Sequence, residues 1–143
     1  MTTPGSSSRV VIPPVMGIHV QDSMDVMIAR NTARRTAALL GFSSTNRAQI
    51  ASAVAVLADI IVNAEQPQTI HLNGLRNGAQ TGIQISCSAP WLAGANPDDA
   101  LFVLRGKLGD MMDEVSIDSG ELPKISMILW LSAARTTQEV NAV

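Results

Sequence analysis

Two long segments of the chain carry apolar residues at every third or fourth position, which is the spacing of one face of an α-helix. In the first segment the repeating positions are Val26, Ala29, Ala33, Ala37 and Leu40. Ser23 is a preferred N-cap residue, and Gly41 is expected to supply the C-cap. We therefore expect a helix from Ser23 to about Leu40.

The second segment predicts a helix that begins at Ser44 or Thr45 and ends near Ala64. Its core face consists of Ile50, Val54, Leu57 and Ile61. Other apolar side chains surround the rest of the helix, which predicts burial on more than one side. Asp59 interrupts the segment, which is short for a membrane span of about 20 apolar residues. We therefore expect a buried core helix and no membrane association.

Shorter apolar runs between glycine, proline and asparagine residues predict β-strands. The predicted strands are Val15–Val20, Thr69–Leu72, Thr81–Cys87, Val115–Asp118 and Lys124–Leu131. Pro13 and Pro14 indicate an edge position for the first strand or a crossing into it, because proline cannot donate a ladder hydrogen bond. Asn-Gly pairs at positions 73–74 and 77–78 predict the turn between the second and third strands.

Pro97 follows Asn96, and this pair predicts the start of a third helix that runs to about Glu114. The resulting order is strand, two helices, two strands, helix, two strands. This order predicts an α+β fold, a two-layer α/β sandwich with the helices on one face of a mixed, mostly antiparallel sheet. The domain is expected to span residues 10–132, between a disordered N-terminus at 1–9 and a C-terminal tail at 133–143.

Composition narrows the class of protein. With 143 residues, 46% of them hydrophobic and 15% charged, the chain is typical of one folded domain. A net charge of −2 and only four aromatic residues (two Trp, two Phe) argue against nucleic-acid binding. Cys87 is the single cysteine, so no internal disulfide can form. Together with the lack of a signal-peptide pattern, this predicts a cytoplasmic protein.

Three stretches resemble the GHKL ATPases, and most closely the small bacterial serine kinases and anti-sigma factors of the RsbT and RsbW kind. The first is Ala29–Ser43, which ends in the leucine-glycine-phenylalanine-serine corner of LLGFS. The second is Ala48–Ala64, similar in length and spacing to the helix that bears the family's N-box. The third is Leu108–Leu131, with LGDMMDEVSIDSG and ISMILWL. The resemblance implies a sandwich of the GHKL, or Bergerat, type.

In the family, an N-box glutamate polarises the attacking water or hydroxyl, and an asparagine four residues later holds Mg²⁺. These positions correspond to Val56 and Ile60 in this chain. Neither side chain has a lone pair, so neither can accept a proton or bind a hard cation. A different placement, shifted by three residues, would put Asp59 and Asn63 at the same spacing.

The family's next motif, aspartate-x-glycine-proline-glycine, binds adenine and lets the backbone approach the nucleotide. In IQISCSAPWL the corresponding positions hold Cys87, Ala89 and Trp91 around a retained Pro90. A thiol is a poor replacement for a carboxylate acceptor. We expect Val56, Ile60 and Trp91 to fill the nucleotide cavity. The resemblance therefore implies no nucleotide, no metal and no other cofactor in this chain.

Other residues that could carry chemistry have a simpler structural interpretation. Asp110, Asp113 and Glu114 suit a solvated helix end better than a metal site. His19 and His71 each lie in a predicted strand, and the sequence shows no cysteine or histidine near either of them, so a structural role is favoured. Cys87 ends an apolar strand without a basic neighbour, which favours a buried packing thiol over a reactive one.

Arg30, Arg34 and Arg35 form a basic patch on the first helix. This patch is either ordinary solvated charge or a docking surface for an acidic partner, because arginine is enriched in interfaces. Met24 and Met27, at the start of the same helix, suit a hydrophobic interface.

The resemblance and the lost positions together predict a non-catalytic regulatory domain, a pseudokinase of the RsbT or anti-sigma type. In the family the partners are sigma factors, STAS-domain antagonists, stressosome subunits and PP2C-type phosphatases. A homodimer through the N-terminal strand and first helix, as in the anti-sigma members, is a further option. Two alternatives stay open: an active serine kinase with an unusual nucleotide site, and a structural subunit of a larger assembly.

Overall fold

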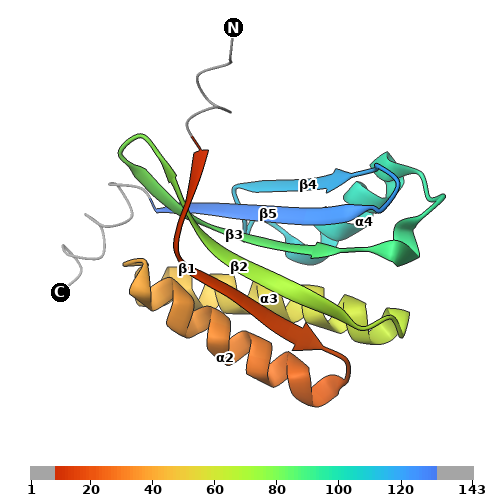
Figure 1. Cartoon of the computed structure of the whole chain (residues 1–143), viewed down its shortest axis with the longest axis horizontal. Helices are drawn as coiled ribbons and strands as arrows, with labels where there is room; N and C mark the ends of the chain where they lie inside the picture. Colours follow the sequence, from red (N-terminus) through yellow and green to blue (C-terminus); the bar gives the residue numbers. More distant parts are fainter. Residues whose placement is uncertain (1–8, 132–143) are drawn as a thin grey trace, which may run out of the picture.

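The computed structural model describes residues 9–131, which contain five strands, three α-helices and one short 3₁₀ helix (Figure 1). In chain order the elements are β1 (Arg9–Val20), α2 (Ser23–Leu39), α3 (Ser44–Ala64), β2 (Gln68–Asn77), β3 (Gln80–Ser88), η1 (Pro90–Leu92), α4 (Pro97–Leu108), β4 (Glu114–Asp118) and β5 (Lys124–Leu131). This order confirms the predicted α+β fold. The expected C-terminal tail at 133–143 and all of the expected disordered N-terminus at 1–9 except Arg9 lie outside the described residues, and Arg9 begins β1.

The five strands form one open sheet in the order β1-β2-β3-β5-β4, and every neighbouring pair is antiparallel. The expectation of a mixed sheet is therefore wrong. Helix α4 between β3 and β4 is long enough to allow a parallel crossover. Instead, β4 lies at the edge of the sheet and pairs only with β5, its hairpin partner.

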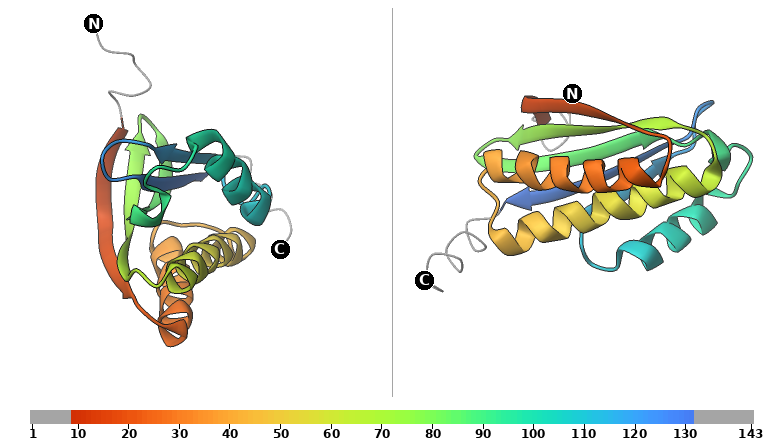
Figure 2. Two further views of the ribbon diagram at one scale, coloured as in Figure 1. Left: turned by 90° about the vertical axis from the view of Figure 1, so that its right-hand side faces the viewer. Right: turned by 90° about the horizontal axis from the view of Figure 1, so that it is seen from below.

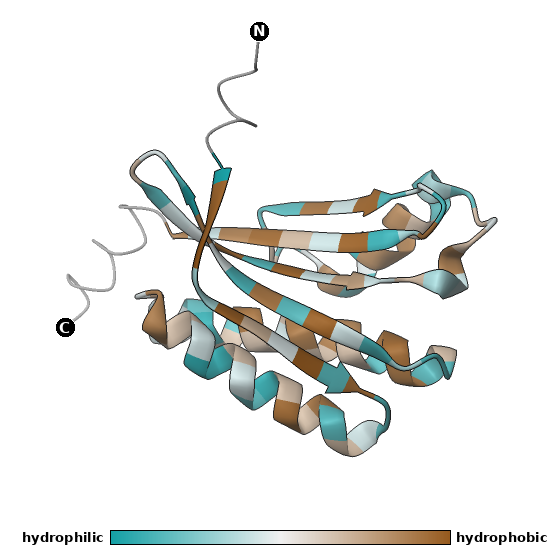
Figure 3. Cartoon of the chain, viewed as in Figure 1, coloured by the Kyte–Doolittle hydropathy of each residue, from teal (hydrophilic) through white to brown (hydrophobic). Residues whose placement is uncertain are grey.

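All three helices cover the same face of the twisted sheet, which gives two layers (Figure 2). Every second strand residue points into this layer, so hydrophobic and more polar residues alternate along the strands in Figure 3. The central strands β3 and β5 contribute the buried residues Ile83, Ile85, Cys87, Ile125, Met127 and Leu129. The core therefore lies between the sheet and helices α2, α3 and α4.

Helix α3 has the predicted core face, because Ile50, Val54, Leu57 and Ile61 are all buried. Helix α2 packs against it through Ala29, Ala33 and Ala37, each fully buried. Small side chains at this spacing allow the two helices to approach closely. Among residues 9–131, α3 is the one helix long and apolar enough to span a membrane. Its burial in this core is also compatible with a soluble protein.

The ends of α2 differ slightly from the prediction. The N-cap residue is Asp22 rather than Ser23, and its carboxylate accepts hydrogen bonds from the backbone N–H groups of Met24 and Asp25. The Asp25 carboxylate accepts one from the Asp22 N–H and completes a capping box. The C-cap residue is Leu40, and Gly41 follows it with φ of 92°.

Strand β1 is longer than predicted, because it begins at Arg9 and passes through Pro13 and Pro14. Its edge position is confirmed, and the pairing register with β2 shifts between Ile12 and Val15. An edge strand can contain prolines because one side of its backbone needs no ladder partner.

Of the two predicted Asn-Gly turn signals, only Asn77-Gly78 is a turn. Asn77 pairs with Gln80, and Gly78 has φ of 62°. Gly74 instead lies inside β2, where a Cβ atom would be 2.7 Å from the Ile12 carbonyl oxygen. This glycine is therefore required for close approach of β1 to β2 rather than for chain reversal.

The third helix is shorter than predicted, because α4 ends at Leu108 and Glu114 belongs to β4. Gly109, with φ of 60°, ends the helix. The carboxylates at 110, 113 and 114 thus lie on a connection and a strand rather than on a helix face.

Gly74→Ala is expected to lower the free energy of unfolding by about 1–3 kcal/mol, because the new methyl group collides with backbone. Gly106→Ala is the matched control. Gly106 lies in α4, and no neighbouring group comes within 4 Å of the position that a Cβ atom would take, so the change should stabilise by about 0.5–1 kcal/mol. Urea unfolding measures both. Equal stability of Gly74→Ala and the unchanged protein would contradict the close approach of β1 to β2.

Candidate functional site

A pocket of about 470 Å³ lies among α3, η1 and α4, with β4 and β5 forming its floor. Most of its wall is apolar, and the apolar residues with large side chains are Ile60, Trp91, Leu92, Val103, Leu104, Ile117 and Ile125. Its polar side chains are Asn96, Asp99 and Lys107. This volume and this composition are typical of sites for small organic molecules, which are mostly apolar with a few polar groups.

Helix α4 supplies one side of the pocket through Asp99, Val103 and Lys107. These residues are four positions apart, so they lie on one face of the helix. Val103 belongs to the wall and is 57% exposed. Asp99 and Lys107 stand roughly 12 Å apart along the helix axis, at a rise of about 1.5 Å per residue.

The N-terminus of α4 is held by Asn96. Its Oδ1 atom accepts hydrogen bonds from the backbone N–H groups of Asp98 at 2.9 Å and Asp99 at 3.2 Å. Pro97 occupies the first helical turn, where the absence of an N–H group costs nothing. This capping uses the oxygen of the Asn96 amide and leaves its NH₂ group available beside the pocket.

Of the five positions that correspond to the family motifs, two meet in this pocket. Ile60 comes from α3 and Trp91 from η1, and both are half-buried in its wall. Val56 is half-buried against the core, whereas Cys87 and Ala89 are fully buried. The expectation that large side chains would fill a nucleotide cavity stays a prediction, and the structure shows that Ile60 and Trp91 line an open space.

The shifted N-box placement involves Asp59 and Asn63, which are both exposed on α3 and do not line the pocket. The one carboxylate in the pocket wall is that of Asp99, on α4. No group of three or more His, Cys, Asp or Glu residues that could hold a metal ion occurs within residues 9–131.

Cys87 lies at the end of β3 and faces the helix layer, with no exposed surface. Burial raises the pKa of its thiol to about 12, because the thiolate would lose its hydration. Such a thiol is a packing group rather than a nucleophile, as the sequence indicated.

The predicted basic patch is present on α2. Arg30, Arg34 and Arg35 are all exposed, and none of them forms an ion pair or a side-chain hydrogen bond within the described part of the chain. Apolar side chains lie on the same helix with large exposed fractions: Met24 76%, Met27 67%, Ile28 52% and Leu39 75%. This combination of free guanidinium groups and exposed apolar residues is a second candidate site.

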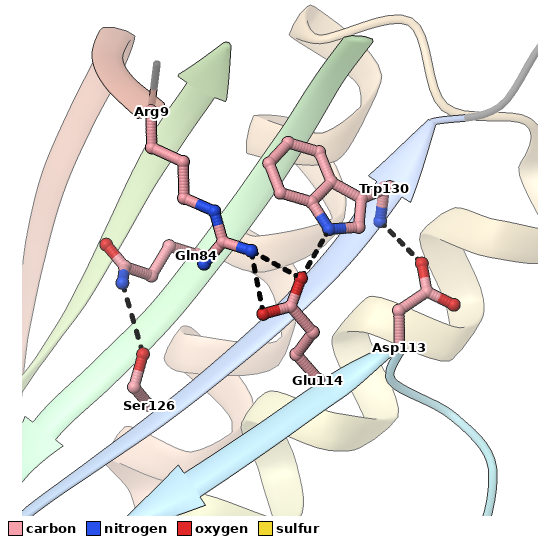
Figure 4. Close-up of polar contacts among 6 residues, drawn as sticks. All are labelled: Arg9, Gln84, Asp113, Glu114, Ser126 and Trp130. Carbon is pink, nitrogen blue, oxygen red and sulfur yellow. Dashed lines mark hydrogen bonds and ion pairs between the residues drawn. The ribbon is translucent and has the colours of Figure 1, made fainter. Parts of the chain in front are cut away.

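The opposite face of the sheet carries a polar cluster around Trp130 (Figure 4). Glu114 accepts hydrogen bonds from Arg9 at 2.9 Å and 3.0 Å and from the Trp130 indole N–H at 2.7 Å. The Arg9 guanidinium also lies 5.4 Å from the Trp130 ring centroid. Asp113 accepts a hydrogen bond from the Trp130 backbone N–H. These carboxylates therefore stabilise the sheet, and the expectation of a solvated helix end is wrong for Asp113 and Glu114.

His19 and His71 both lie exposed on this helix-free face, where Gly17 pairs with His71 and His19 with Thr69. Neither histidine belongs to a group of possible metal ligands in the part of the chain between Arg9 and Leu131.

The contribution of α4 to the pocket was not foreseen from the sequence. The four-residue spacing of Asp99, Val103 and Lys107 was the available signal, but nothing in it identified the facing element.

Compared with known proteins, the chain matches no family model and no curated sequence. The GHKL resemblance therefore stays a prediction, and the α+β sandwich is the level at which the fold is shown.

The free energy of unfolding is expected to fall as the pH rises from about 9 toward 12. In that range the unfolded Cys87 thiol, whose ordinary pKa is 9.0, loses its proton while the folded thiol keeps it. Urea unfolding at several alkaline pH values measures this slope. Cys87→Ala should flatten it, and an unchanged slope in that variant would show that another group is responsible.

Proposed function

We propose that this chain is a non-catalytic regulatory domain that acts by binding an acidic protein partner through the outward surface of α2. The observation that carries the proposal is that three arginines on that one helix form no ion pair with any residue between Arg9 and Leu131 and lie beside exposed methionine and aliphatic side chains. The family resemblance suggests the setting, which is bacterial signalling or transcription control in the cytoplasm. It also suggests the class of partner: a sigma factor, a STAS-domain antagonist, a stressosome subunit or a PP2C-type phosphatase.

Arginine and methionine suit this role for separate physical reasons. The guanidinium group forms paired hydrogen bonds with a carboxylate and remains charged at physiological pH. Exposed methionines are flexible and polarisable, so they fit partners of different shape. Met27 and Arg34 are exposed on α2 and about two turns apart, which would place apolar and charged contacts side by side.

The α3 positions support binding without catalysis. Phosphoryl transfer requires groups that position the nucleophile and hold Mg²⁺. Val56 packs against the core and Ile60 lines an apolar wall, so neither supplies an oxygen ligand. Helix α3 on this proposal serves as a structural support for α2.

Mg²⁺-ATP is expected to leave the melting temperature unchanged. A nucleotide present at 100 times its Kd would instead add about 2.7 kcal/mol of stability. Differential scanning fluorimetry with Mg²⁺ alone as the control measures the difference. A shift that grows with ATP concentration would favour the alternative of an active kinase with an unusual site.

Arg34→Glu is expected to weaken partner binding by about tenfold or more, because a favourable ion pair becomes a repulsion. Arg76→Glu is the matched control, since Arg76 is exposed on β2 and forms no ion pair among the described residues. The three forms are immobilised, and proteins captured from the native cell are quantified by mass spectrometry. A partner should be retained by the unchanged protein and by Arg76→Glu, and lost from Arg34→Glu and at high salt.

Equal capture by all three forms would contradict the proposal. The surface of α2 could instead bind a second copy of the chain, and light scattering tests this alternative by measuring the molar mass in solution. A dimer that Arg34→Glu dissociates would make the surface a self-interface rather than a site for an acidic partner.

A further inference from the structure

We infer that the pocket between α3, η1 and α4 binds a small amphipathic organic acid, with its apolar body against Ile60 and Trp91 and its acidic group toward Lys107. The inference does not depend on the α2 surface, because the two sites share no residue.

The size and wall of the pocket favour an apolar body. Its volume is about 470 Å³, and Ile60, Trp91 and Val103 face it from three different elements. Val103 and Trp91 are left partly exposed by the empty space, so a ligand would remove apolar surface from water on entering. A purely polar ligand would gain little from such a wall.

The hydrogen-bonding groups of the lining side chains favour an acidic head. Lys107 and Trp91 are donors only, and neither forms a side-chain hydrogen bond within residues 9–131. The Asn96 oxygen is used in capping α4, so its NH₂ group adds a third available donor. Asp99 is the one acidic side chain in the wall. Because Asn96 lies beside Asp99 at the start of α4 and Trp91 contacts the apolar body, Lys107 is the donor that suits the oxygen atoms of a carboxylate or sulfonate.

The positions of the two charges set the orientation of the ligand. Asp99 lies in the first turn of α4, where helix N–H groups stabilise its negative charge, and Lys107 lies in the last turn. An acidic group is repelled at the Asp99 end and attracted at the Lys107 end. The apolar body then extends from Lys107 toward Trp91.

Two fluorescent probes with the same ring system test the inference: anionic 8-anilinonaphthalene-1-sulfonate and neutral N-phenyl-1-naphthylamine. Both should bind the unchanged protein, the anion more tightly. Val103→Trp should weaken binding of both probes, because the larger side chain would occupy part of the pocket. Phe102→Trp is the matched control, because Phe102 is 80% exposed on the same helix and does not line the pocket. It should leave both affinities within about twofold.

The charge is tested separately. Lys107→Glu should weaken the anionic probe by about fivefold and leave the neutral probe unchanged, whereas Lys107→Arg should retain both affinities. Decanoate and 1-naphthoate then compete with the anionic probe. Displacement by the first indicates a fatty acid, and displacement by the second indicates an aromatic acid.

Several results would overturn the inference. These are no probe binding to the unchanged protein, equal binding to Val103→Trp, an equal effect of Lys107→Glu on both probes, or displacement by neither acid. A different outcome is that the unchanged protein binds neither probe but captures a protein partner, and that Val103→Trp no longer captures it. That outcome would show that a side chain of the partner, rather than a small molecule, occupies the pocket. Arg34→Glu should bind both probes with unchanged affinity. A failed prediction of partner binding through α2 is therefore distinguishable from a failed prediction of ligand binding in the pocket.

Discussion

The burial of α3 between α2 and the sheet is the constraint on which the rest of the structure depends. Its core face of Ile50, Leu57 and Ile61 is almost entirely removed from water, and the alanines of α2 allow the two helices to pack closely. A helix held in this way cannot rotate to present a different face. Consequently only the flank that carries Ile60 reaches the pocket, and the chemistry available from α3 is that of an aliphatic side chain.

The pocket exists because α4 packs less tightly than the other two helices. Leu104 and Leu108 are its buried residues, while Phe102 and Val103 remain exposed. Two anchoring leucines fix the position of the helix but leave the space toward α3 and Trp91 unfilled.

On the far side of the sheet, Glu114 binds Arg9 and Trp130. This contact connects the start of β1 with β4, so the two edge strands of the sheet are joined on the face that no helix covers.

Local patterns were sufficient for most of the architecture. The alternation of strand residues, the helical periodicity of Ile50, Val54 and Leu57, and the position of Gly41 all depend on backbone geometry within a few residues. The errors occurred where distant contacts decide the outcome. Gly74 resembles a turn signal but lies in a strand because β1 approaches it, and Glu114 was assigned to a helix but belongs to β4, where Arg9 and Trp130 bind it.

For the candidate sites too, some features follow from the local sequence and others from the packing of distant elements. The sequence alone determined that Val56 and Ile60 have no lone pair, that Cys87 ends an apolar strand, and that three arginines share one helix, because these are properties of side chains and of local spacing. Only the tertiary structure decided that Ile60 and Trp91 line the same open space and that Asp99, Val103 and Lys107 belong to its wall. A cavity is the space left over when separate elements pack, and that space depends on distances between residues far apart in the chain.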